Sequence, residues 1–432
     1  MPPRVNDAPA NEVTLGIDFG TSNSAAALID RDGKLQVIVL DDSRPEMPTA
    51  LFFASETHTV AFGSQAMQAY LSSTEGRLLR SLKSLLGSRL MDEYTVVNNQ
   101  SIRFFDIVVL FFKELKRRCE IHVGHPIERA MLGRPVHFVD DNPERDALAQ
   151  DTLARAAREA GFTHISFQLE PIAAAFDYEQ RIATETTALV VDIGGGTSDF
   201  TVIRLNPERS RDADRSGDIL ATTGVHIGGT DFDRLLDLST VMPLLGYKHI
   251  GTAGRPVPNS IFFDLSTWHL IHQTTTRKAL HFARELWTDY VDQTLHARLM
   301  EVIEEHHGHR ILAGVEVAKI ACSVSGESAA VNLDFLSAPA AAPLDASITA
   351  PGMREALSQP VAQVVACALQ CIAASGLARV DVMYLTGGSS ALQPLVDALQ
   401  TALPGTALVH GDRFGGVAAG LAYAGFLVPN NP

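Results

Sequence analysis

The stretch VVDIGGGTSDFTVI, residues 190–203, places an aspartate inside an apolar β-type run, follows it with three glycines and then resumes the run. A buried carboxylate is costly unless a charged or hydrogen-bonding group meets it. Successive glycines lack Cβ atoms, so their backbone N–H groups can approach an anion together. The stretch therefore predicts a turn at Gly194, Gly195 and Gly196 that holds an anion, with Asp192 and Asp199 beside it.

An earlier stretch repeats this pattern. VTLGIDFGTSNSAAALID, residues 13–30, has an apolar run, an aspartate, an apolar residue and a glycine in the same order, with Asp18 in the place of Asp192. Its turn contains Gly20, Thr21 and Ser22, whose backbone and hydroxyl groups can donate hydrogen bonds. Internal similarity of this kind predicts two related lobes, each with an anion-binding hairpin.

The aspartates of both hairpins require a cation, because carboxylates repel phosphate. Magnesium fits, since this hard, hydrated ion binds through one or two carboxylates, its own waters and phosphate oxygens. The chain has no G-x-x-x-x-G-K-[ST] loop, and Asp199 takes the sixth position of a G-x-G-x-x-G pattern. A strand also follows the glycines where a dinucleotide-binding fold needs a helix. The hairpins therefore predict a nucleoside triphosphate site of another kind.

Length and composition set wider limits. The chain has 432 residues, 46% of them hydrophobic and 20% charged, which is typical of a globular protein with two or more domains or two large lobes. A formal charge of −15 argues against nucleic acid as a partner, because that affinity depends on Lys and Arg. No signal peptide and no apolar stretch of ~20 residues is evident, so the sequence predicts a cytoplasmic protein without a membrane span.

Several ordered motifs carry a family resemblance. With both hairpins, EPIAAAFDY, IGGTDFDRLL and LTGGSSALQPL in order, the chain resembles the nucleotide-binding domain of DnaK-type heat-shock chaperones, in the superfamily of actin and sugar kinases. The resemblance covers nearly the whole chain. It implies an α/β protein with a two-lobed actin-like ATPase fold, in which each lobe is an RNase-H-like mixed sheet flanked by helices.

The same resemblance implies the lobe boundaries. The first lobe would comprise residues 11–187, with an outer subdomain at about 41–122, and would be completed by residues 409–432. The second lobe would comprise residues 188–408, with an outer subdomain at about 237–344. ATP would bind in the cleft between the two lobes.

The resemblance assigns the turns to the phosphates and the carboxylates to magnesium. The first phosphate loop would be Gly20, Thr21, Ser22 and Asn23, and the second Gly194, Gly195, Gly196 and Thr197. Gly228 and Gly229 resemble the turn on the phosphate side that precedes a helix. Asp18, Asp192 and Glu170 look like the carboxylates around hydrated magnesium. Asp199 resembles the group that positions the attacking water, so we predict Asp199, Thr197 and Glu170 as the catalytic set.

The resemblance also implies an adenosine site. The segment EVAK is similar to the family's adenosine-binding helix, with Glu316 and Lys319 at the ribose and Ser323 at the adenine edge. Gly387, Gly388 and Ser389 would pack against the adenosine, with Asp412 near it.

The sequence departs from the family pattern at three positions, and a fourth residue could compensate for one of them. Met67 stands where the family has a catalytic lysine, and Lys83 matches a different family lysine that could compensate. Ile320 and Ala391 replace two arginines beside the adenine, and each loss removes cation–π stacking worth about 0.5–2 kcal/mol. We therefore expect weaker or less base-selective nucleotide binding and slow hydrolysis.

The predicted function is a magnesium-dependent, slow ATPase or ATP-binding switch related to chaperones, with a protein partner or co-chaperone. The chain stops soon after LAYAGFLVPNNP, so we expect a short, YegD-like form without a peptide-binding domain. Two alternatives remain open: a sugar-type small-molecule kinase of the same superfamily, and an actin-like filament or nucleotide-bound scaffold without turnover.

Some other features have simpler interpretations. The cluster EEHHGHR, residues 304–310, is more typical of a solvent-facing helix end than of a zinc site. Trp287 is expected in the core. Cys367 and Cys371, one helical turn apart, are expected on a buried helix face. Pro135 resembles a family proline that couples nucleotide state to interdomain signalling, but a proline that simply opens a loop after a strand is an equally good interpretation.

Overall fold

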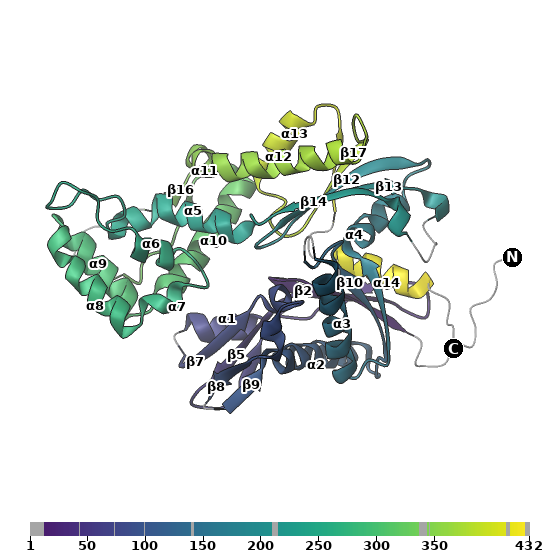
Figure 1. Ribbon diagram of the computed structural model, residues 1–432, viewed down its shortest axis with the longest axis horizontal. Helices are drawn as coiled ribbons and strands as arrows, with labels where there is room; N and C mark the ends of the chain where they lie inside the picture. The colour runs from purple at the N-terminus through teal and green to yellow at the C-terminus, as the bar shows by residue number, and fades with distance from the viewer. Residues whose placement is uncertain are drawn as a thin grey trace.

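Two mixed β-sheets organise the chain in this computed structural model, which describes residues 13–42, 44–72, 74–98, 100–139, 142–209, 215–336, 344, 346–411 and 415–427. The first sheet has the strand order β11-β10-β1-β2-β3, with β4 also paired to β2. The second has the order β14-β13-β12-β17-β18. Figure 1 shows the first sheet in the lower, purple and blue lobe and the second in the upper lobe.

The strands of the two sheets are short to medium in length. Those of the first sheet are β1 (Thr14–Phe19), β2 (Asn23–Ile29), β3 (Leu35–Val37), β4 (Glu46–Pro48), β10 (Arg129–Arg134) and β11 (His164–Leu169). Those of the second sheet are β12 (Thr186–Ile193), β13 (Ser198–Leu205), β14 (Ile219–Val225), β17 (Val382–Thr386) and β18 (Ala407–His410).

The two sheets repeat one topology. Each sheet begins with an antiparallel hairpin, β1–β2 in the first and β12–β13 in the second. The first strand of the hairpin pairs in parallel with a strand from later in the chain, β10 or β17. That strand pairs in parallel with the next one, β11 or β18. Asp18 and Asp192 occupy matching strands, β1 and β12. The prediction of two related lobes is thus confirmed at the level of strand order.

Helices cover both faces of the sheets. The helices of the inner parts are α2 (Phe104–Val123), α3 (Pro143–Glu159), α4 (Glu170–Glu179), α12 (Ser358–Ala374), α13 (Gln393–Ala402) and α14 (Gly416–Leu427). Helix α14, yellow in Figure 1, returns to the first lobe and packs on β1, β2 and β10. Helix α4 packs on α14 and reaches β12 and β13. These two helices therefore lie between the two sheets.

Outer segments extend each lobe. In the first, a sheet of β5 (Ala50–Ala54), β6 (Val60–Phe62) and β7 (Gly76–Arg80) packs on α1 (Ser64–Leu71), beside the hairpin of β8 (Tyr94–Val97) and β9 (Gln100–Arg103). In the second, the elements are α5 (Gly229–Thr240), α6 (Ser260–Leu265), α7 (Ile271–Thr274), α8 (Arg277–Glu285), α9 (Gln293–Glu304), α10 (Gly308–Ser325), α11 (Ala350–Ala356), β15 (Ala329–Ala330) and β16 (Ser347–Ile348). The lobe and subdomain boundaries given above stay a prediction.

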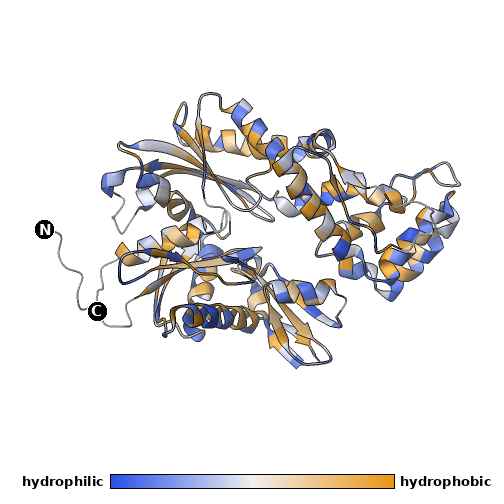
Figure 2. Cartoon of the chain, turned by 180° about the vertical axis from the view of Figure 1, so that it is seen from behind, coloured by the Kyte–Doolittle hydropathy of each residue, from blue (hydrophilic) through white to orange (hydrophobic). Residues whose placement is uncertain are grey.

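Burial follows the hydropathy of the sequence. Hydrophobic and hydrophilic colours alternate along many helices in Figure 2, as expected for helices with one face packed and one in solvent. Cys367 and Cys371 are buried on α12, as predicted. Trp287 corrects a prediction, because it is 53% exposed and not in the core. Its ring meets His296 edge-on (5.6 Å between ring centroids), and about half of the residue stays in solvent.

Within the described ranges, no single helix has the length and apolar composition to cross a bilayer. The pair α11 and α12 meets both criteria only when taken together, across a bend of 65°.

Candidate functional site

The first predicted phosphate turn lies between β1 and β2. Its shape depends on Thr49, a fully buried residue that follows β4. The hydroxyl of Thr49 donates to the carbonyl of Gly20 (2.8 Å), and its backbone N–H donates to the carbonyl of Ser22 (2.8 Å). Thr49 thus ties both ends of the turn to the outer part of the first lobe. The sequence analysis missed this residue, because nothing in the local pattern marks it.

The second turn, between β12 and β13, is held from the second lobe. Gly229 and Thr230 donate backbone hydrogen bonds to the carbonyls of Gly194 (3.0 Å) and Gly195 (2.8 Å). The turn itself closes with a bond from the N–H of Gly194 to the carbonyl of Thr197 (2.9 Å). The start of α5 therefore braces the glycine turn, and the phosphate-side role of Gly228 and Gly229 stays a prediction.

The two turns meet. A Cβ added at Gly195 would lie 2.0 Å from Oγ of Ser22, so a side chain at this position would collide with the other turn. Another loop adjoins them, because a Cβ on Gly229 would lie 2.4 Å from Oγ of Ser389, and one on Gly387 would lie 2.3 Å from a carboxylate oxygen of Asp192. The turns of the two lobes and the loop after β17 thus come together at one place between the sheets.

Acidic side chains surround this meeting point. Asp192 and Asp199 are direct cross-strand neighbours in the β12–β13 register, an arrangement of like charges that destabilises a sheet by itself. Burial raises the pKa of Asp192 to about 8, and repulsion from Asp199, Glu170 and Asp18 adds to the effect. Burial also raises the pKa of Asp18 to about 7, with repulsion from Glu170. The protein alone leaves this negative charge poorly compensated.

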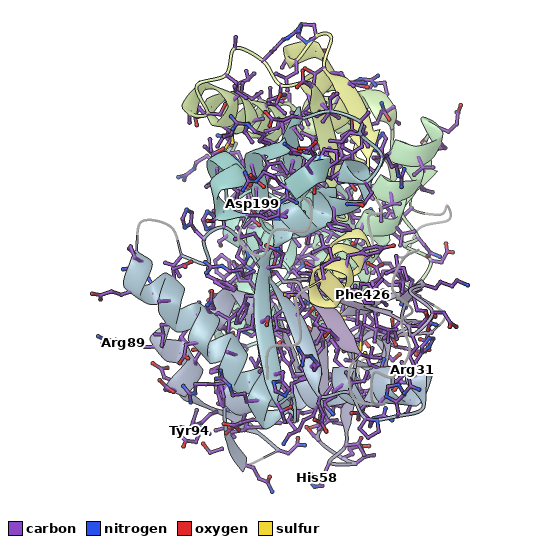
Figure 3. All side chains as sticks on the ribbon, turned by 90° about the vertical axis from the view of Figure 1, so that its right-hand side faces the viewer. Arg31, His58, Arg89, Tyr94, Asp199 and Phe426 are labelled. Atoms are coloured by element: carbon purple, nitrogen blue, oxygen red, sulfur yellow. The ribbon has the colours of Figure 1, made fainter. Side chains whose placement is uncertain are left out.

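Asp199 differs from the other carboxylates because its side chain is exposed. It accepts a hydrogen bond from the hydroxyl of Thr197 (2.9 Å). Figure 3 shows it near the middle of the molecule, whereas Arg31, His58 and Tyr94 lie at the outer edge of the first lobe. A carboxylate held in this way can orient a water molecule and accept its proton.

Lys83 brings a positive charge to this cluster. Its ammonium group lies 2.7 Å from Oε1 of Glu170, and both side chains are about seven-eighths buried (13% and 12% exposed). Burial lowers the pKa of Lys83, but attraction to Glu170 and Asp18 outweighs it and the net shift is upward, so the side chain stays charged. Met67, in contrast, packs with the apolar group of Ala50, Phe52 and Ala66.

The comparisons with known proteins agree with this architecture. The model of the family described as Hsp70 protein matches residues 14–241, which is more than half of the chain. The chain belongs to the Hsp70 family.

Curated chaperones are similar over about half of the chain. A "Chaperone protein DnaK" of Thermosipho africanus is 30% identical over 233 residues, 53% of this chain and 36% of the relative. That of Mycoplasmopsis agalactiae is 28% identical over 226 residues, 52% of this chain and 34% of the relative. A "Chaperone protein HscA homolog" of Rickettsia akari is 29% identical over 244 residues, 51% of this chain and 36% of the relative. The chain thus spans about a third of the length of these relatives.

Family membership confirms the predicted fold. The two mixed sheets with flanking helices are the actin-like ATPase fold of an Hsp70-type nucleotide-binding domain. The match to the family model ends at residue 241, directly after α5.

Within this Hsp70 fold, helix α10 carries the residues predicted to contact adenosine. The hydroxyl of Ser323 donates to the carbonyl of Ala391 (3.2 Å) and accepts from the N–H of Gln393 (2.9 Å), which places α10 beside the loop after β17. Lys319 is buried and lies 2.7 Å from Asp233 of α5. Ile320 is 53% exposed. Both Lys319 and Ser323 thus have internal partners, which the sequence did not indicate, and Asp412 lies outside the described residues.

The outer parts of the two lobes also touch. The hydroxyl of Tyr70 on α1 lies 2.7 Å from Nδ1 of His309 on α10. His309 in turn lies 3.0 Å from the carbonyl of Trp268, and the guanidinium of Arg80 lies over the Trp268 ring at 4.5 Å. The Arg80 charge also interacts with Glu316 and Asp233. We call Tyr70, Arg80, Trp268 and His309 the cross-lobe contact.

The carboxylate cluster fits a hydrated divalent cation. Its donors are hard oxygens, and one lysine faces several carboxylates, so additional positive charge would relieve their repulsion. Throughout the ranges that the structure describes, no three His, Cys, Asp or Glu side chains are grouped so that they could hold a metal ion directly. This finding covers the described residues of the EEHHGHR segment as well.

Proposed function

We propose that this chain binds magnesium and ATP between its two lobes and hydrolyses ATP slowly, so that the bound nucleotide sets how the lobes close. The observation that carries the proposal is the meeting of the Ser22 and Gly195 turns at a cluster of carboxylates. Two backbone turns from separate lobes at one place can cradle a polyphosphate from both sides.

Each part of the site has a proposed role. The backbone N–H groups of both turns would bind the phosphate oxygens, with the hydroxyls of Thr21, Ser22 and Thr197. Asp18, Asp192 and Glu170 would hold magnesium through its waters. When bound, magnesium would offset the negative charge of the phosphates. Asp199 would orient the attacking water, and Lys83 would take the charge-stabilising role that Met67 cannot fill.

The proposal also includes an adenosine site and a protein partner. The base would lie between α10 and the loop at Gly387, Gly388 and Ser389, near Glu316. A protein partner that recognises lobe closure, such as a co-chaperone, fits a switch of this kind. The cytoplasmic location inferred from the sequence stays a prediction.

Thermal unfolding with nucleotides tests the proposal. A ligand that binds only the folded state stabilises it by RT ln(1 + [L]/Kd), about 2.7 kcal/mol at one hundred times the Kd. We expect ATP and ADP to raise Tm and magnesium to increase the effect. Equal Tm values with and without millimolar-scale nucleotide and magnesium would refute nucleotide binding. A panel of sugars that strongly accelerates ADP formation would instead identify a kinase.

A further inference from the structure

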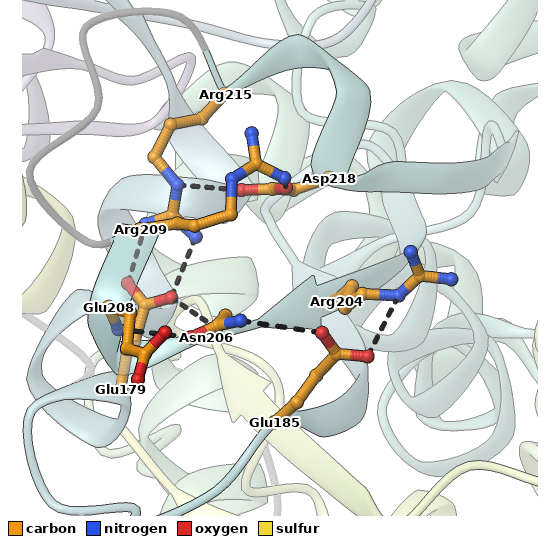
Figure 4. Close-up of polar contacts among 8 residues, drawn as sticks. All are labelled: Glu179, Glu185, Arg204, Asn206, Glu208, Arg209, Arg215 and Asp218. Atoms are coloured by element: carbon orange, nitrogen blue, oxygen red, sulfur yellow. Dashed lines mark hydrogen bonds and ion pairs between the residues drawn. The ribbon is translucent and has the colours of Figure 1, made fainter.

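A buried ionic cluster lies at the end of the second sheet that is remote from the phosphate turns. It joins the last residue of α4 to the connection between β13 and β14 (Figure 4). Glu179 is fully buried, and its two oxygens accept hydrogen bonds from Nη1 (2.5 Å) and Nη2 (2.7 Å) of Arg215. Nε of Arg215 donates to Asp218 (2.8 Å), which also accepts from Arg209 (2.6 Å).

The geometry of this cluster is specific. The Arg215–Glu179 pair is bidentate, and Oε1 of Glu179 also accepts from the backbone N–H of Asn206 (2.8 Å). Burial disfavours the Arg215 charge, but hydrogen bonds and attraction from Glu179 and Asp218 outweigh it and raise the pKa of Arg215. A buried bidentate pair constrains position more than it adds to stability, because desolvation offsets much of the attraction.

Helix α4 connects this cluster to the phosphate site. Its first residue is Glu170, which pairs with Lys83 of the first lobe. Its last residue is Glu179, which is held by the second lobe. At 1.5 Å per residue the two ends are about 14 Å apart, so one short, stiff helix spans from the cluster to the site.

The middle of α4 is held by apolar packing against α14. The middle of the helix is Ala173, Ala174 and Ala175, and a Cβ added at Gly420 of α14 would lie 2.0 Å from the carbonyl of Ala173. Such small residues allow close approach, and Phe176 adds a ring that stacks on Tyr423 of α14 (4.9 Å between ring centroids). No side chain caps the N-terminus, where Leu169 is the capping position. The ionic cluster adds to this packing a polar restraint that ties the far end of α4 to the second lobe.

We propose that Glu179, Arg215 and Asp218 form an anchor that fixes α4 to the second lobe and thereby positions Glu170 at the phosphate site. These are positioning residues, because they act through α4 and lie at the end of the helix away from the phosphate turns. The inference rests on the proposed function for the role of Glu170, but the anchoring of α4 can be measured without nucleotide.

The decisive variant replaces the charges without leaving one unpaired. Arg215→Met alone leaves the buried Glu179 carboxylate without a charged partner and can unfold the protein. The double variant Glu179→Gln/Arg215→Met removes one negative and one positive charge, so the net charge of the cluster is unchanged. Asp218 keeps Arg209 as its partner. Replacing a buried ion pair by uncharged residues of similar size is often close to neutral for stability. We expect the double variant to fold with a Tm near that of the parent. Arg204→Met serves as the control, because Arg204 makes a half-exposed pair with Glu185 nearby (3.3 Å).

Two readouts separate positioning from mere stabilisation. Hydrogen–deuterium exchange of residues 170–176, without nucleotide, should be about tenfold faster in the double variant. The gain in ATP affinity that magnesium provides, taken as the ratio of the Kd values in EDTA and in magnesium, should fall about tenfold. Arg204→Met should change neither, and Arg215→Lys should retain part of both.

The outcomes are distinct. Faster exchange together with a smaller magnesium gain supports the inference. Unchanged exchange overturns it, because α4 would then be held without the anchor. Faster exchange with an unchanged magnesium gain also overturns it, because the anchor would not position Glu170. If the parent chain binds no ATP at all, the proposed function fails, and the positioning of Glu170 for nucleotide fails with it, while the exchange data still decide whether α4 is anchored.

Discussion

Lys83 is the residue on which the proposed turnover depends. It pairs with Glu170 at 2.7 Å, and its charge acts on Asp18 and Asp192. We expect Lys83→Met to lower ATP turnover by about 10²-fold, since a charge-stabilising group in an active site contributes on this scale. Single-turnover hydrolysis measures the effect. Met67→Leu is the control and should leave the rate unchanged, because Met67 packs in an apolar group. Equal rates in Lys83→Met and the parent would remove Lys83 from the mechanism.

The lowered pKa of His309 predicts how the free energy of unfolding depends on pH. Burial lowers its pKa from the usual 6.5 to about 4, with Arg80 and His272 acting in the same direction and the Trp268 carbonyl opposing. Between these values the unfolded chain binds a proton that the folded chain does not, so stability falls as the pH falls from about 6.5 towards 4. The loss between pH 7 and pH 5 should be about 2 kcal/mol from this residue.

Urea unfolding at the two pH values tests this expectation. Since carboxylates also titrate, the informative quantity is the difference between the parent and His309→Gln. The variant should lose less stability on acidification. The same loss in both proteins would show that His309 does not remain neutral in the folded state.

Ile320 offers a gain-of-function test on α10. It is 53% exposed beside Ser323, where the family resemblance places an arginine at the base. Ile320→Arg should tighten ATP binding by roughly 2- to 30-fold, the equivalent of about 0.5–2 kcal/mol of cation–π stacking. Calorimetry measures the change. Ala321→Arg adds the same charge in a different direction and should have a much smaller effect, so equal gains would point to general electrostatics.

At the scale of elements, adjacent glycines of the β12–β13 turn should tolerate substitution differently. A Cβ at Gly195 would lie 2.0 Å from Oγ of Ser22, whereas one at Gly196 has no protein atom within 4 Å among the residues described. Gly195→Ala should separate the two turns and abolish most of the stabilisation by ATP. Gly196→Ala keeps the backbone N–H and should preserve it.

Thermal unfolding with and without ATP and magnesium separates these cases. The two variants carry the same change at neighbouring positions, so each is a control for the other. Loss of ATP stabilisation in Gly196→Ala alone would contradict the arrangement of the turns.

At the scale of the whole molecule, the cross-lobe contact should govern how readily the lobes separate. Tyr70→Phe removes the hydroxyl that meets His309 and keeps the ring. A lost hydrogen bond of about 1 kcal/mol shifts the open–closed equilibrium about fivefold. Release of a fluorescent ADP should accelerate by a similar factor. Tyr94→Phe is the control, because Tyr94 is 65% exposed at the outer edge of the first lobe, and an equal acceleration there would rule the contact out.

Local patterns in the sequence were enough to predict much of the fold. The two hairpins are encoded by consecutive residues, so the apolar runs, the aspartates and the glycines could be read directly. Their similarity predicted two related lobes, and the repeated strand order bears this out. Trp287 was misplaced, because a helical pattern does not reveal whether another element covers a given face.

The sequence by itself determined the paired hairpins and the family, because those features depend on residues close together in the chain. Only the tertiary structure decided which distant groups meet. Glu170 pairs with Lys83, which is 87 positions away in the sequence, and Tyr70 contacts His309, which is 239 positions away. Thr49 at the first turn and Arg215 at the end of α4 belong to the same class. Such contacts arise when separate elements pack, so they cannot be predicted from the sequence around either partner.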